Sequence, residues 1–272
     1  MTETLGFRTP EHTSRHQPDV LEDDLDRLTL DYMKGRADRI AATVAEPGSK
    51  HEAYKRAHER FVEREADPQL QRFGKLLLLA PLVVRSERRL GDIRQHMTRG
   101  QRLDRTTADE RRQLVRTSCA YNQMWRAFLE EHQEEVPPSQ AAVWLERAGG
   151  NNAGWAKRMV NGMATEIAAA KMLGRMEGTE TDKRLELSNI RYGDLEQDLK
   201  GQDILFDLPD GQTGAVDVKT GQHRPSEHVS RDSRTRNILL SIDPAHIKLD
   251  SYEVDEQYAS LYTVPLADAL TK

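Results

Sequence analysis

Apolar side chains recur at helical spacing through the first half of the chain. Two such stripes occur near the N-terminus, one formed by Leu21, Leu25, Leu28, Tyr32 and Ile40, and the other by Tyr54, Ala57, Phe61 and Val62. A third helix is expected over residues 69–99, bent or broken near Pro81 because proline cannot donate an internal helix hydrogen bond. A fourth is expected to begin near residues 106–110, where two threonines precede acidic residues. The first half is therefore predicted to be a helical bundle.

The pattern changes in the second half of the chain. The predicted elements are, in order, a helix over residues 152–176, a strand over 184–190, a β-hairpin with strands at 203–208 and 214–219, and a strand over 237–242. The hairpin is expected because its two apolar segments flank residues 209–212, which are rich in turn-forming Pro, Asp and Gly. A tail of mixed strand and short helix follows. Helices and strands in this order predict an α+β or α/β core.

Interruptions in these patterns divide the chain into three parts. Residues 1–17 are polar and are expected to form a loose leader. The helical domain is predicted over residues 18–140. Two interruptions mark its end: a Glu-rich and Pro-rich stretch at 134–139 and the sequence Gly-Gly-Asn-Asn at 149–152. The second domain is therefore predicted over residues 150–272.

Composition narrows the class of protein. The chain is 37% hydrophobic and 31% charged, and its net charge of −5 argues against a protein that coats nucleic acid or an anionic membrane. The longest apolar run, Leu76 to Val84, is about half the length that a membrane span needs, so no membrane partner is expected. Cys119 is the only cysteine, which excludes an intramolecular disulfide and fits a reducing, cytoplasmic setting. Its position in an apolar helix stripe predicts a place in the core.

Positive charge is concentrated in one part of the predicted bundle. Residues 71–120 contain 12 basic and 5 acidic side chains, although acidic residues outnumber basic ones over the whole chain. Such a run is usually the solvated face of a helix, and a surface that contacts phosphates is the alternative. The sequence leaves both interpretations open.

The most specific chemistry lies on the predicted hairpin. Asp217 and Lys219 are two residues apart on one strand, so their side chains are expected on the same face. Asp203 begins the partner strand, close enough across the hairpin to share a site. Two converging carboxylates repel each other, and a divalent cation is the commonest way to offset that repulsion. The three residues are therefore interpreted as a metal site with a lysine beside it.

These residues resemble the PD-(D/E)xK, or restriction-endonuclease-like, nuclease superfamily. In that family a helix bearing a glutamate precedes a strand that opens with Asp and a second strand that ends in Asp/Glu-x-Lys. The sequence Asp217-Val218-Lys219 is similar to the last motif, and Gly201-Gln202-Asp203-Ile204 is similar to the first acidic motif, with glutamine where the family usually has proline. Gly162-Met163-Ala164-Thr165-Glu166 resembles the helix motif. The resemblance covers roughly residues 152–245 and implies a mixed central sheet flanked by helices.

The resemblance also implies roles for individual residues. Asp203 and Asp217 would hold Mg²⁺, or Mn²⁺ as an alternative, with the Val218 carbonyl as a further ligand and Glu166 as the third acid. Lys219 would orient or help to deprotonate the attacking water and would neutralise a phosphate oxygen. The implied substrate is DNA, with RNA left open. Such cores often work as dimers when both strands are cut, which makes a homodimer one expected assembly.

Residues 220–236 have no apolar periodicity and are expected to form a loop beside the site. The candidate nucleic-acid contacts in this loop are Gln222, Arg224, Arg231, Arg234 and Arg236. A basic loop beside a metal site would suit a phosphate backbone, and an ordinary solvated loop is the alternative.

The sequence as a whole predicts a metal-dependent nuclease that hydrolyses phosphodiester bonds, with DNA as its expected substrate. Restriction or defence, junction resolution and repair all stay open as its setting. The alternative is a non-catalytic nucleic-acid-binding or assembly protein that retains the nuclease fold. Three clustered charged residues argue against that alternative, because a scaffold has no use for so costly a cluster.

Overall fold

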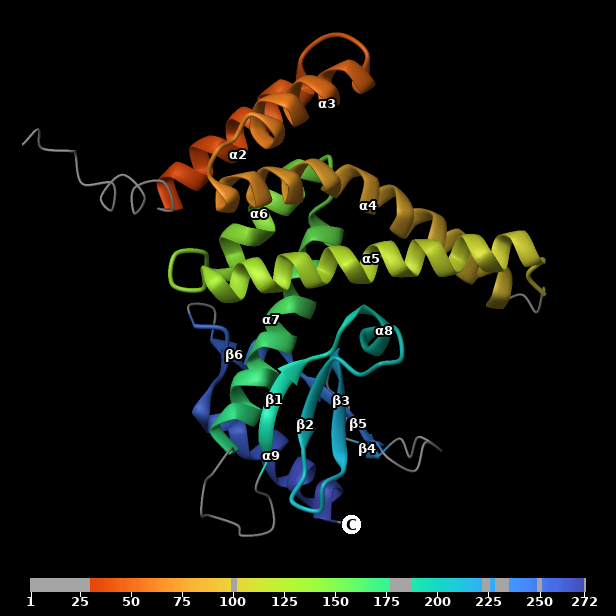
Figure 1. Ribbon diagram of the computed structural model, residues 1–272, viewed down its shortest axis with the longest axis vertical. Helices are drawn as coiled ribbons and strands as arrows, with labels where there is room; N and C mark the ends of the chain where they lie inside the picture. The colour runs from red at the N-terminus through yellow and green to blue at the C-terminus, as the bar shows by residue number, and fades with distance from the viewer. Residues whose placement is uncertain are drawn as a thin grey trace, which may run out of the picture.

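The computed structural model describes residues 30–98, 102–176, 187–221, 226–227, 235–248 and 251–271. It combines a helical N-terminal region with a mixed β-sheet, which confirms the prediction of an α+β protein (Figure 1). The predicted leader, residues 1–17, lies outside the described residues, as do Leu21, Leu25 and Leu28 of the first apolar stripe.

The described residues between 30 and 148 form six helical segments. They are α2 (Leu30–Ala45), α3 (Lys50–His58), the π-helix η1 (Glu59–Glu63), α4 (Pro68–Thr98), α5 (Arg105–Glu131) and α6 (Pro138–Ala148). The helix predicted over residues 69–99, bent or broken near Pro81, is confirmed as α4, which continues through Pro81 without a break. Helix α5 begins at Arg105, just before the predicted start near residues 106–110. The side chain of Asp104 caps the helix by accepting a hydrogen bond from the Thr107 N–H at 2.9 Å.

Helix α6 was not predicted, since its sequence lies between the two interruptions at residues 134–139 and 149–152. The Pro137-Pro138 pair starts the helix rather than ending it, because proline is well tolerated in the first helical turn. Its residue Trp144 is buried in the helical core, where its ring packs edge-on against Phe73 of α4 with ring centroids 5.0 Å apart.

The sheet has the strand order β1-β2-β3-β5-β4. Its strands are β1 (Ser188–Tyr192), β2 (Ile204–Asp207), β3 (Thr213–Thr220), β4 (Ser226–Glu227) and β5 (Thr235–Ile242). Strands β2 and β3 form the predicted antiparallel hairpin, with Ile204 opposite Val216. Strand β5 runs parallel to β3 and places Leu239 opposite Asp217. Strand β1 lies later than predicted, and residues 184–186 are outside the described part of the chain.

Helix α7 (Ala153–Met176) agrees with the helix predicted over residues 152–176 and connects the two parts of the molecule. Its N-terminal half, including Trp155 and Ile167, is buried in the helical core. Its C-terminal half, including Ala168 and Leu173, is buried in a second core against the sheet. One continuous helix therefore contributes side chains to both cores.

The C-terminal tail contains the mixture of strand and helix that the sequence predicts. It consists of the 3₁₀-helix η2 (Pro244–His246), the short strands β6 (Ile247–Lys248) and β7 (Glu253–Val254), and α9 (Glu256–Thr271). Helix α9 packs on the sheet core through Tyr262 and Leu266. Across the described parts of the chain, no helix is long and apolar enough to cross a membrane.

Candidate functional site

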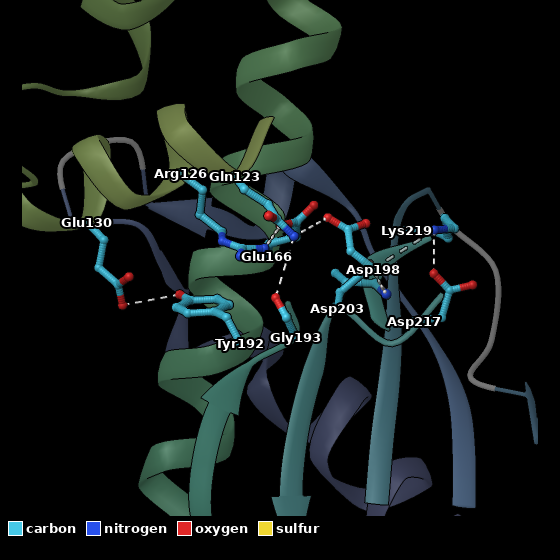
Figure 2. Close-up of polar contacts among 11 residues, drawn as sticks. Gln123, Arg126, Glu130, Glu166, Tyr192, Gly193, Asp198, Asp203, Asp217 and Lys219 are labelled. Carbon is cyan, nitrogen blue, oxygen red and sulfur yellow. Dashed lines mark hydrogen bonds and ion pairs between the residues drawn. The ribbon is translucent and has the colours of Figure 1, made fainter. Parts of the chain in front are cut away.

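Asp203, Asp217 and Lys219 converge at one end of the β2–β3 hairpin (Figure 2). The Lys219 ammonium forms an ion pair with Asp217, and its Nζ lies 4.0 Å from Oδ2 of Asp203. Asp203 immediately precedes β2, and its Oδ2 accepts a hydrogen bond from the Val218 N–H at 2.7 Å. The structure thus brings the two carboxylates and the lysine together.

The turn before β2 brings its backbone close to Asp217. Gly201 has a φ of +73°, which suits glycine, and a Cβ added there would lie 3.1 Å from Oδ2 of Asp217. This turn follows the one-turn helix α8 (Leu195–Asp198), whose Asp194 and Gln197 form a capping box. The local sequence therefore fixes the approach of the Asp203 backbone to β3.

Asp203 is the more buried of the two carboxylates, with only 5% of its surface exposed. Burial and the negative charges of Glu166 and Asp217 raise its pKa to about 8, although the charge of Lys219 and the hydrogen bond from Val218 act in the opposite direction. Negative charge is therefore not fully offset by the protein groups around Asp203.

Lys219 is half exposed and stays an ammonium group in this arrangement. Burial lowers its pKa, but the hydrogen bond to Asp217 and the charges of Asp203 and Glu166 outweigh this effect and raise the pKa above its usual value. In this arrangement Lys219 is suited to binding an anion. The base role that the family resemblance also allows would need a lowered pKa, which these neighbours do not provide.

Glu166 lies on α7 and is held by an arginine of the helical region. Nη1 of Arg126 donates to Oε2 of Glu166 at 2.6 Å, and the guanidinium also lies 4.1 Å from the centre of the Tyr192 ring. Burial raises the pKa of Glu166, whereas the charge of Arg126 lowers it. The negative charge of Asp198 also raises the pKa of Glu166, and the charge of Glu166 raises the pKa of Asp203.

Helix α5 lies directly over this site, which the sequence did not predict. One stripe of its side chains faces the sheet and α8, and it consists of Arg116, Cys119, Gln123, Arg126 and Glu130. Gln123 donates to Asp198 at 2.9 Å, and Glu130 accepts a hydrogen bond from the Tyr192 hydroxyl at 3.2 Å (Figure 2). The only sequence signal for this stripe is polar residues at helical spacing, which are as common on solvated faces.

Cys119 belongs to this polar stripe rather than to the apolar core expected for it. Its side chain is half buried, and burial together with the charges of Asp198 and Asp203 raises the pKa of its thiol to about 12. The thiol is therefore protonated near neutral pH and is not activated as a nucleophile.

The donor atoms at the hairpin suit a hard cation. The carboxylates of Asp203 and Asp217 and the Val218 carbonyl are oxygen ligands, and the incompletely offset charge at Asp203 is of the kind that a divalent ion balances. Glu166 is engaged by Arg126 instead. Within the described ranges, no group of three His, Cys, Asp or Glu residues is arranged to hold a metal ion.

Of the five predicted nucleic-acid contacts, Arg236 alone is among the described residues. Gln222, Arg224, Arg231 and Arg234 lie outside the described residues. Arg236 is the second residue of β5 and lies opposite Gly214, near the turn of the hairpin, and its Nη2 lies 3.9 Å from Oδ2 of Asp210. The structure therefore does not bring Arg236 together with the carboxylates, which lie toward the opposite end of β3.

Comparison of the chain with protein-family models, curated proteins and solved structures found no match.

Proposed function

We propose that the protein is a metal-dependent nuclease with a restriction-endonuclease-like core. The observation that carries the proposal is the convergence of Asp203, Asp217 and Lys219 at the end of one hairpin. The order of elements also supports it, because a helix with Glu166 precedes an antiparallel meander and a final parallel strand. A buried carboxylate next to a second carboxylate is costly for a purely structural site.

In the proposed reaction each residue has a role that its surroundings allow. Asp203 and Asp217 would hold the metal, with the Val218 carbonyl as a further ligand. When bound, Mg²⁺ would supply a more acidic water and would stabilise negative charge on the phosphate. Lys219, as an ammonium, would donate to a non-bridging phosphate oxygen and orient the scissile group.

The exposed fractions of these side chains indicate the direction from which a substrate would approach. The side chain of Lys219 is 55% exposed and that of Asp217 is 28% exposed, whereas Asp203 is covered. A phosphodiester would therefore approach along the end of β3. We propose DNA as the substrate, and RNA is tested alongside it.

A non-catalytic nucleic-acid-binding role is the second candidate function. The observation that favours it is the ion pair between Arg126 and Glu166, which occupies the acid expected to complete the metal shell. In this case the protein would bind nucleic acid through Lys219 and neighbouring basic residues without cleaving it.

The decisive experiment is incubation of the purified protein with supercoiled, linear and branched DNA and with RNA, in the presence of Mg²⁺ or Mn²⁺. Asp217→Ala and Lys219→Ala should each abolish cleavage. Asp207→Asn is the matched control, because Asp207 lies at the other end of β2 and pairs with Arg191 at 3.2 Å. Equal behaviour of wild type and both site variants on every substrate would refute the nuclease proposal.

Metal binding has a readout that does not need a substrate. Mg²⁺ should raise the thermal unfolding midpoint of the wild type and of Asp207→Asn, because a ligand that binds only the folded state stabilises it. Asp203→Asn and Asp217→Asn should lose this response. Binding of DNA by the wild type without cleavage and without a Mg²⁺ response would favour the second candidate function.

A further inference from the structure

The helical region contains a large cavity that the proposed nuclease chemistry does not use. Its volume is about 880 Å³, and its lining residues come from α2, α3, α4, α6 and the turn after α6. None of the described lining residues belongs to α5 or to the sheet. The cavity is within the range of about 300–1,000 Å³ that is usual for small-molecule sites.

The wall of the cavity is mainly apolar. Its apolar lining includes Ile40 and Val44 of α2 and Leu77 and Leu78 of α4. Leu82 also lines the cavity and is 41% exposed. An apolar group that entered here would cover Leu82 and would be removed from water.

The charged residues that line the cavity all have the same sign. They are Lys50 at the start of α3, Arg85 and Arg88 on α4, and Arg147 on α6. No Asp or Glu occurs among the described lining residues, although the chain has 45 acidic and 40 basic side chains. The N-terminus of α3 adds the positive end of a helix dipole at Lys50.

Two of these cations are free to bind an anion. Arg147 pairs with Asp38, and Nε of Arg85 donates to the Pro81 carbonyl at 3.4 Å. The side chains of Lys50 and Arg88 are exposed, and they make no hydrogen bond or ion pair within the part of the chain that the structure describes.

Trp144 supplies a further polar group. It lines the cavity, is 2% exposed, and its indole Nε1 has no hydrogen-bond partner among the described residues. A buried N–H donor without a partner is uncommon in native structures. A ligand that carries an acceptor atom would satisfy this donor.

We propose that this cavity binds a small amphiphilic anion, that is, an apolar chain or ring system with one carboxylate or phosphate group. The apolar part would lie against Leu77, Leu82 and Trp144, and the anionic group would be held by Lys50 and Arg88. This site is independent of the proposed nuclease function.

The test is calorimetric titration of the full-length protein with palmitate and with palmitoyl lysophosphatidate, each below its micelle concentration. Hexadecanol, which has the same chain length and no charge, is the third ligand. We expect saturable binding at one site, with at least one anion binding about tenfold more tightly than hexadecanol. Whichever anion binds more tightly identifies the headgroup.

Variants locate the binding in the cavity. Arg88→Ala and Lys50→Ala should each weaken anion binding about tenfold. Arg94→Ala is the matched control, since Arg94 is exposed on the same helix and does not line the cavity, and it should bind like the wild type. Ala41→Trp should block binding by filling the space, with circular dichroism to verify that the variant is folded.

Several results would overturn the proposal. They are the absence of saturable binding to either anion, equally tight binding of hexadecanol, and equal losses in Arg88→Ala and Arg94→Ala. Sedimentation of the same samples addresses another occupant. If the anions halve the molecular mass of the particle, the cavity face is an interface with a second copy of the chain, and the ligand proposal is wrong.

Discussion

Arg126 and Glu166 form an ion pair whose side chains are only 6% and 19% exposed. Arg126→Met would leave the Glu166 carboxylate buried without its partner, so we expect a loss of about 3–5 kcal/mol in the free energy of unfolding. Urea denaturation measures this loss. The double variant Arg126→Met with Glu166→Gln should recover part of it, because the uncompensated charge is removed.

A matched control for this pair is Arg72→Ala, which breaks the ion pair between Arg72 and Glu131 on α4 and α5. Both of those side chains are at least one third exposed, so water screens the interaction and the expected cost is below about 1 kcal/mol. Equal losses for Arg126→Met and Arg72→Ala would contradict the interpretation that burial makes the Arg126 pair important.

Asp203 should make the fold less stable as the pH rises. Its pKa is raised to about 8 by burial and by neighbouring carboxylates, so the folded state keeps a proton that the unfolded state releases near pH 4. The contribution of Asp203 to the free energy of unfolding therefore falls as the pH rises from about 4 to about 8. In the presence of EDTA, Asp203→Asn should be more stable than the wild type at about pH 9, and the difference should shrink toward about pH 5.

The control for this prediction is Asp207→Asn, which should be less stable than the wild type by an amount that does not change between about pH 5 and pH 9, because a lowered pKa acts only below about pH 4. Hydrogen bonds from Asn189 and Arg191 lower the pKa of Asp207, so its charged form stabilises the fold. Thermal melting over this pH range distinguishes the two residues. A stability difference between Asp203→Asn and the wild type that does not change with pH would contradict the assignment.

Two glycines of α4 show how packing decides the effect of the same substitution. A Cβ at Gly91 would meet no atom within 4 Å, so Gly91→Ala should stabilise the protein by about 0.5–1 kcal/mol through better helix propensity. A Cβ at Gly74 would lie 2.6 Å from the Phe61 carbonyl oxygen of η1, so Gly74→Ala should destabilise it by about 1–3 kcal/mol. Urea denaturation of both variants provides the measurement, and shifts of the same sign would contradict this explanation.

Elements with a strong local signal were predictable from the sequence. Helix α7 has a long apolar periodicity, and the β2–β3 hairpin has an unmistakable turn sequence. Helix α4 was predicted almost to its ends, but a bend or break was expected at Pro81 and α6 was missed, because local rules treat proline as an interruption. At α6 the proline lies in the first turn, and at α4 the long apolar segment packs on both sides of Pro81.

The candidate site was predictable only where its residues are close in sequence. Asp203, Asp217 and Lys219 belong to one hairpin, so strand periodicity brings them together. The pairing of Arg126 with Glu166 joins residues 40 positions apart in different helices, and it depends on how α5 packs over the sheet. No local pattern contains that information, which is why the cover over the site was not predicted.

The two hydrophobic cores share α7 and are also joined by the contacts of α5 with Glu166 and α8. We therefore expect the described fold to unfold in one cooperative transition. All three tryptophans, Trp125, Trp144 and Trp155, lie in the helical core, so their fluorescence reports on that core alone. Hydrogen exchange of β3 amides reports on the sheet core.

Ile238→Ala tests this cooperativity, because Ile238 is 1% exposed in the sheet core and contacts no part of the helical core cluster. The substitution should cost about 2–5 kcal/mol. If the cores unfold together, two free energies of unfolding fall by the same amount: the one measured by tryptophan fluorescence in urea and the one measured by hydrogen exchange of β3. If β3 loses protection while the fluorescence midpoint stays unchanged, the cores are independent, and α7 connects them without coupling their stability.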